Sequence, residues 1–118
     1  LGNFVLSSGY YDAYFTKAQK VRRLIKTKTE EMLKNNDVLI LPTAPSTAFN
    51  IGEIKDPIKM YLQDIFTVHA NITGAPAISL PIGIHSNNLP FGIQLMANSF
   101  QENTLFEVSN LLMEKYLE

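Results

Sequence analysis

The chain has 118 residues, of which 46% are hydrophobic and 18% charged, as in an ordinary soluble globule with a core of its own. Its net charge of −1 gives no general attraction to nucleic acid or to an anionic membrane, and without cysteine it forms neither disulfides nor thiolate metal sites. No apolar run approaches the ~20 residues of a membrane span. We expect a single domain over 1–118, cut from something longer, because Leu1 starts inside an apolar segment.

The first predicted element is a long helix. Ser7 or Ser8 is its expected N-cap, and the polar residues at 35–37 end it. Apolar residues recur at helical spacing along one face, namely Tyr11, Tyr14, Phe15, Ala18, Val21, Ile25, Met32 and Leu33. Lysine and arginine occupy the opposite face, so the pattern predicts an amphipathic helix with a basic outer side.

A short strand and a second helix follow. Residues 38–42 (VLILP) are continuously apolar, which is typical of a strand covered on both faces, and a proline-rich loop over 42–49 leaves this strand. Asp56 as N-cap and Pro57 at the first helical position then start a helix. We expect one helix from there to Gly74, which stops it together with the proline that follows.

Two strands and a last helix complete the predicted order. Residues 77–84 and 91–97 flank the turn HSNNLP and predict a β-hairpin. Pro81 has no amide hydrogen, so it should lie at a sheet edge or a bulge. Ser99 and Glu102 form an expected capping box for a helix whose inward residues are Leu105, Val108, Leu112 and Tyr116. The order α-β-α-β-β-α predicts an α/β fold with a small mixed sheet, which we expect the long first helix and the last helix to pack.

Asp64 is the candidate binding residue. It lies in the second predicted helix beside an apolar stripe, one turn from Met60 and Val68, with no cation close by in sequence. One interpretation is a boundary carboxylate that reaches water. The other is an acid held at the edge of a cleft, where it grips a cationic group. The residues alone leave both interpretations open.

The other ionisable residues give weaker evidence of a functional site. His69 falls near the middle of the apolar stripe, which is typical of a core histidine with a satisfied hydrogen bond, whereas His85 in the predicted turn should face solvent. The two histidines lack the paired spacing typical of metal ligands, so the evidence for a metal site is weak. Residues 17–28 hold six cations and no acid, which favours a solvated helix face over a phosphate-binding one. We assign no catalytic, cofactor-binding or metal-binding residue.

Four segments, taken in order, resemble the amidase signature family. They are LSSGYYDAYFTKAQKVRRLI, DVLILPTAPSTAF, DPIKMYLQDIFTVHANITGAPAISLPIG and LPFGIQLMANSFQENTL, and together they extend over essentially the whole chain. Within the family, the likeness is to the C-terminal part of the A subunits of glutamyl-tRNA(Gln) amidotransferases. One departure is that His69 and Ala70 stand where such subunits are expected to have Pro-Ala or Pro-Val.

The resemblance implies a role within a larger cytoplasmic enzyme. An A subunit of this kind hydrolyses glutamine with a Ser–cis-Ser–Lys triad, and the ammonia passes to the B subunit. The B subunit uses ATP and Mg²⁺ to amidate glutamate on tRNA(Gln), and a small C subunit completes the complex. This chain contains no Gly/Ser-rich triad segment, so the resemblance implies no catalytic residue and no cofactor here, and no activity of this chain alone. Asp64 matches the family's aspartate that binds the α-ammonium of glutamine.

Two alternatives remain at this point. One is a related amidase that hydrolyses another amide or a carbamate. The other is a non-catalytic interaction module that docks through the basic stretch KAQKVRR at 17–23. The resemblance implies contact with tRNA only through the complex, and no contact with a membrane.

Overall fold

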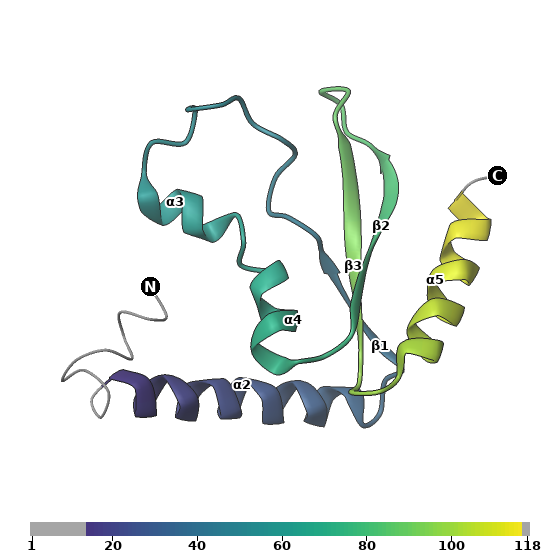
Figure 1. Ribbon diagram of the computed structural model, residues 1–118. Helices are drawn as coiled ribbons and strands as arrows, with labels where there is room; N and C mark the ends of the chain where they lie inside the picture. The colour runs from purple at the N-terminus through teal and green to yellow at the C-terminus, as the bar shows by residue number, and fades with distance from the viewer. Residues whose placement is uncertain (1–13, 117–118) are drawn as a thin grey trace.

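The computed structural model describes residues 14–116 (Figure 1). In chain order its elements are helix α2 (Thr16–Leu33), strand β1 (Val38–Pro42), helices α3 (Pro57–Leu62) and α4 (Thr67–Thr73), strands β2 (Ala77–Ile84) and β3 (Pro90–Ala97), and helix α5 (Glu102–Tyr116). The α/β class and the positions of the predicted strands are confirmed. The expectation that residues 38–42 are covered on both faces is wrong, because β1 lies at an edge of the described sheet and Ile40 is 55% exposed. The expected N-caps Ser7 and Ser8 lie outside the described residues.

The described strands form one sheet in the order β1-β3-β2. β3 pairs antiparallel with β1 on one side and with β2 on the other. Pairing is therefore antiparallel throughout the described residues, and not mixed as expected. The reason is that β1 and β2 run in the same direction but are separated by β3, which runs against both.

The predicted hairpin is confirmed, and Pro81 lies where its missing amide hydrogen does least harm. β2 is an edge strand of the described sheet, and its register against β3 shifts between Pro81 and Gly83. Such a shift leaves one residue without a partner in the ladder, as in a β-bulge. Pro81 therefore lies on an edge strand and next to a bulge, which are the two kinds of place expected for it.

One face of the sheet is covered by α5. Leu80, Leu95, Ala97 and Leu105 form the buried core there, and Val108 and Leu112 pack against it as predicted. The predicted inward position of Tyr116 is wrong, because this residue ends α5 with 62% of its surface exposed.

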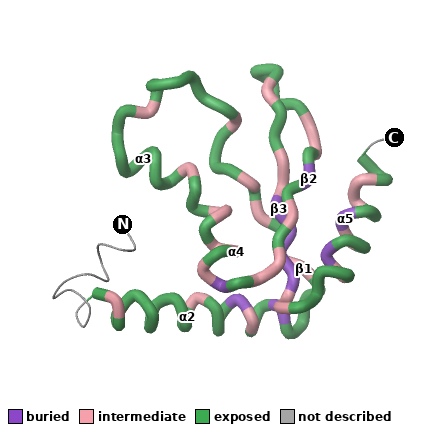
Figure 2. Tube along the Cα trace, in the orientation of Figure 1, coloured by how far each residue is buried: buried purple, intermediate pink, exposed green. Residues whose placement is uncertain are grey.

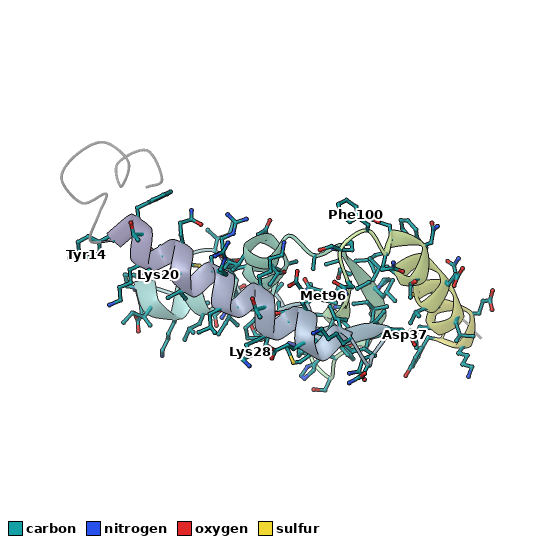
Figure 3. The ribbon with its side chains drawn as sticks, turned by 90° about the horizontal axis from the view of Figure 1, so that it is seen from below. Tyr14, Lys20, Lys28, Asp37, Met96 and Phe100 are labelled. Atoms are coloured by element: carbon teal, nitrogen blue, oxygen red, sulfur yellow. The ribbon has the colours of Figure 1, made fainter. Side chains whose placement is uncertain are left out.

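The start of α5 also differs from the prediction. α5 begins at Glu102, so Ser99 is not its N-cap. Phe100 has a φ of 63°, in the left-handed region, and the chain cannot run helically through it from Ser99. The side chain of Phe100 projects at this turn between β3 and α5, with 91% of its surface exposed (Figure 3).

The helix expected from Asp56 to Gly74 is broken into α3 and α4. Its two ends are as predicted: the Asp56 carboxylate accepts the Ile58 amide at 2.9 Å, and Gly74 ends α4 with a φ of 71°. Between them, the amides of residues 63–65 donate to carbonyls only three residues earlier, as in a 3₁₀ turn. This tightening breaks the α-helical ladder and produces the turn 63–66.

On the other side of the sheet, α4 lies between β3 and α2 (Figure 1). We expected the first and last helices to pack the sheet. This is confirmed for α5, whereas α2 packs chiefly against α4. Buried residues gather where β3, β1, α5 and the end of α2 meet, and α3 is exposed along its length (Figure 2).

Candidate functional site

Asp64 lies in the turn 63–66, and its backbone is fully bonded. Its amide donates to the Tyr61 carbonyl at 3.2 Å, and its carbonyl accepts the Val68 amide at 2.9 Å and the Thr67 hydroxyl at 3.1 Å. The Asp64 side chain is exposed, and within residues 14–116 no group donates a hydrogen bond to its carboxylate or pairs with it. The turn therefore fixes the residue and leaves its carboxylate free to bind a ligand.

The surroundings of this carboxylate are apolar. Asp64 lines a cavity of about 420 Å³ between α2, α3 and α4. The other lining residues are Ile25, Ile58, Tyr61, Leu62, Ile65, Val68, His69 and Ile72. An apolar wall lowers the local dielectric, so a cation there interacts with the carboxylate more strongly than it would in open water. Asp64 thus lies at the border of a cleft, which is the geometry that the second interpretation of this residue requires.

His69 is the other ionisable group in this cavity that the sequence singled out. Its Nε2 lies 2.8 Å from the hydroxyl of Thr29, and the same hydroxyl donates to the Ile25 carbonyl at 2.9 Å. A hydroxyl has one proton, and the Thr29 hydroxyl donates it to the Ile25 carbonyl. The Thr29–His69 hydrogen bond therefore forms when His69 donates from Nε2 to the hydroxyl oxygen. His69 is therefore a half-buried histidine with a satisfied hydrogen bond, as the sequence indicated.

The basic face of α2 is partly engaged within the chain. Arg22 donates from Nε to the Ile72 carbonyl at 2.9 Å and so ties α2 to the last turn of α4. Lys26 lies 3.8 Å from Glu30 and Lys28 lies 2.8 Å from Glu31. The Lys28 contact lowers the pKa of the Glu31 carboxyl. Lys20 and Lys28 both lie along this helix (Figure 3), which is mostly exposed as expected of a solvated face.

A second cavity, of about 780 Å³, lies between the proline-rich loop after β1 and the ends of β2 and β3. Exposed His85 lines it, in agreement with its predicted solvent-facing position. The Thr43 and Ser79 hydroxyls are 2.8 Å apart at its wall. Asp64 and His69 do not line this cavity, so the structure does not bring the two histidines together.

Sequence reasoning missed two residues that organise the site. Thr29 is 2% exposed and holds His69, and Gln94 is 6% exposed and donates from Nε2 to the Phe66 carbonyl at 3.2 Å. The available signal was a polar residue placed among apolar neighbours, as Gln94 is in GIQLMA. Buried polar side chains are nearly always hydrogen-bonded, but the sequence does not say to what.

The described site combines an exposed carboxylate, that of Asp64, with an apolar wall. This combination suits a ligand that carries a positive charge next to an apolar part. Within residues 14–116, no three His, Cys, Asp or Glu side chains cluster as metal ligands, and no helix has the length and apolar character needed to cross a membrane.

The fold is that of an amidase. The model of the Amidase family matches residues 1–106, and the chain belongs to that family. It is 55% identical over 112 residues to the glutamyl-tRNA(Gln) amidotransferase A subunit of Halothermothrix orenii, a match that covers 95% of this chain and 24% of the relative. The chain spans about a quarter of the length of the curated relatives it matches.

Solved structures agree with this assignment. The crystal structure of the glutamyl-tRNA(Gln) amidotransferase A subunit from Thermotoga maritima is 51% identical and superposes with a TM-score of 0.84, covering 97% of this chain and 25% of that one. A 6-aminohexanoate cyclic dimer hydrolase is 28% identical with a TM-score of 0.73, covering 92% and 25%. The resemblance noted in the sequence is thus confirmed.

Proposed function

We propose that this chain is part of the glutamine-hydrolysing A subunit of a glutamyl-tRNA(Gln) amidotransferase. The observation that carries the proposal is the 55% identity to a protein of that name over 95% of the chain, against 28% identity to a hydrolase of another amide. The proposed reaction releases ammonia from glutamine for the conversion of Glu-tRNA(Gln) to Gln-tRNA(Gln). The B and C subunits are the proposed partners, ATP and Mg²⁺ act in the B subunit, and the location is cytoplasmic.

Within the proposed enzyme, Asp64 binds the α-ammonium of glutamine. Its free carboxylate, the fixed turn beneath it and the apolar cavity beside it support this role. Glutamine carries its positive charge on the α-ammonium, so a carboxylate placed here distinguishes it from simple amides that lack the amino group. The chain contributes this binding residue and structural elements, while the nucleophile comes from elsewhere in the full-length protein. The 118-residue chain alone is therefore proposed to be inactive.

Replacing Asp64 in the full-length, assembled enzyme tests the proposal. A hydrogen bond to a charged partner contributes roughly 1.5–3 kcal/mol, so Asp64→Ala should lower glutamine-dependent kcat/KM by about ten- to a hundredfold. Asp64→Asn keeps the shape and loses the charge, so it should lose much of the same activity. The measurement is amidation of tRNA-bound glutamate with glutamine as the nitrogen donor.

Free ammonia provides the matched control in the same assay. Ammonia needs no α-ammonium site, so both variants should use it nearly as well as the unmodified enzyme. A boundary residue would leave both donors unaffected, and a purely structural residue would impair both equally. Either of these results contradicts the proposed role of Asp64. Wild-type enzyme that hydrolyses another amide in preference to glutamine would instead favour the related-amidase alternative.

A further inference from the structure

Gln94 is a polar side chain at an apolar place. It lies on the central strand β3, directly before Leu95, Met96 and Ala97, which are all fully buried. Gln94 itself is 6% exposed. Burying an amide costs free energy unless the amide is hydrogen-bonded, so the partner of this side chain is informative.

That partner belongs to the turn that carries Asp64. The Nε2 of Gln94 donates to the carbonyl of Phe66 at 3.2 Å. Phe66 is the last residue of the turn 63–66 and the N-cap residue of α4. Asp64 lies two residues before Phe66, and its carbonyl accepts hydrogen bonds from Thr67 and Val68, the two residues that follow Phe66. A displacement of Phe66 therefore also moves Asp64, because both belong to the same short, hydrogen-bonded segment.

The other end of the same turn has its own attachment. Ser46, in the loop after β1, donates from its hydroxyl to Oε1 of Gln63 at 3.0 Å. This bond is exposed, whereas the Gln94 bond is partly buried and starts from the central strand. Exposed side-chain bonds exchange readily with water, so Gln94 is the firmer of the two attachments.

We propose that Gln94 is a positioning residue for Asp64. Its amide fixes the turn 63–66 to the sheet, so that the free carboxylate is held in the orientation that binds a cationic group. Holding a binding group in place before the ligand arrives removes part of the ordering cost from the binding step. The inference rests on the proposed role of Asp64 and adds a residue that does not itself touch the ligand.

The test is a double-mutant cycle in the full-length, assembled enzyme. Gln94→Met keeps an unbranched side chain of similar length and removes the donor. We expect it to lower glutamine-dependent kcat/KM by about two- to tenfold, mainly through KM, and to leave ammonia-dependent amidation unchanged. In an Asp64→Asn background the same substitution should have little further effect, because a residue that acts through Asp64 has nothing left to position.

Ser109→Ala is the matched control. Ser109 is 4% exposed on α5, on the opposite face of the sheet, and its hydroxyl donates to the Leu105 carbonyl at 2.6 Å. The substitution removes a buried hydrogen bond from a side chain to a backbone carbonyl, within α5 and away from the turn. The ratio of glutamine- to ammonia-dependent activity in this variant should therefore equal that of the unmodified enzyme.

The outcomes separate the two claims. If Asp64→Asn has no effect on glutamine use, the proposed function of Asp64 fails, whatever Gln94 does. If Asp64→Asn impairs glutamine use and the Gln94→Met effect adds to it in full, only the positioning role is refuted. Should Gln94→Met not yield an assembled enzyme, Gln94→Leu, which also lacks a donor, takes its place in the cycle. Failure of both variants to fold assigns Gln94 to the fold alone and overturns the inference.

Discussion

Asp64 and His69 line the same cavity but differ in their hydrogen bonding. His69 is bonded to Thr29, whose hydroxyl also reaches the Ile25 carbonyl. The Asp64 carboxylate has no bonding partner within residues 14–116. A charged group beside an apolar wall gains more from a cationic ligand than one in bulk water does. At the scale of single residues, His69 is thus held within the chain, whereas the Asp64 carboxylate is available for the binding role proposed for it.

This distinction predicts the effect of removing the Thr29 hydroxyl. Thr29→Val keeps the β-branched shape and leaves the half-buried His69 Nε2 without its partner. Stranding a buried donor costs about 1–3 kcal/mol, and we expect the full-length protein to lose stability by that amount, measured as the free energy of unfolding in urea. The exposed Thr27 on the same helix is the control, since Thr27→Val should change stability by no more than about 0.5 kcal/mol. Equal losses in the two variants would show that the Thr29–His69 bond contributes nothing.

At the scale of elements, the break between α3 and α4 decides how the site is presented. In one continuous helix, Asp64 would lie at the flank of the apolar stripe with a fixed helical orientation. The 3₁₀-type bonds at 63–65 instead place it in a short turn that connects to β3 through Gln94 and to the loop after β1 through Gln63. Mid-helix 3₁₀ stretches often mark functional positions, and this one carries the candidate binding residue.

The hairpin of β2 and β3 gives a prediction at the same scale. A Cβ added at Gly92 would lie 2.7 Å from the Leu80 carbonyl oxygen, a backbone atom of the paired strand that cannot move aside. Gly92→Ala should therefore push the strands apart and lower the stability of the full-length protein by about 1–3 kcal/mol. The measurement is again unfolding in urea.

Gly83→Ala on the same hairpin is the comparison. There the nearest atoms belong to the ring of Phe91, at 3.1 and 3.2 Å, and this side chain is 42% exposed and free to shift. Gly83→Ala should cost clearly less than Gly92→Ala. A larger loss of stability in Gly83→Ala than in Gly92→Ala would contradict the prediction that a side chain at Gly92 pushes the two strands apart.

At the scale of the whole molecule, the chain is extended and carries uncovered apolar surface. Its radius of gyration is 17.2 Å, whereas a compact chain of this length has about 13.5 Å. Large apolar side chains such as Ile51, Ile58, Tyr61 and Phe100 are at least 70% exposed. Large apolar side chains are usually more buried than this in a stable protein, which points to a surface that covers them. The chain spans about a quarter of its relatives, which is consistent with cover supplied by the rest of a longer protein.

We therefore predict that the purified 118-residue chain associates with itself as its concentration rises. We also predict that it hydrolyses no glutamine, because the proposed nucleophile lies elsewhere in the full-length protein. Light scattering and binding of a dye for apolar surface measure the first property, and ammonia release measures the second. The full-length protein is the control: we expect it to cover these side chains and therefore to bind less dye per chain. A chain that is monomeric at every concentration without dye binding would contradict the first expectation, and ammonia release above a blank would contradict the second.

Features that depend on neighbouring residues could be predicted from the amino-acid sequence. The strands at 38–42 and 77–84 follow from local apolar runs, the start of α3 from the Asp56 carboxylate two residues before the amide it accepts, and the end of α4 from the left-handed Gly74. The sequence also selected Asp64 as the candidate binding residue, through its apolar neighbours and the family motif. Each of these signals lies within a few residues of the feature it predicts.

Features that join distant segments became visible in the folded chain and could not be predicted from the sequence. The Gln94 amide meets Phe66 across 28 positions and His69 meets Thr29 across 40, and no local pattern specifies either pair. The capping box at Ser99 matched its local pattern but is overridden by the left-handed backbone of Phe100. The helix expected from Asp56 to Gly74 is periodic throughout, yet it breaks at a turn that contacts β3 and the loop after β1. Helical periodicity records which face is apolar, whereas the contacts available to a polar backbone group at a given point depend on which segments the fold brings beside it.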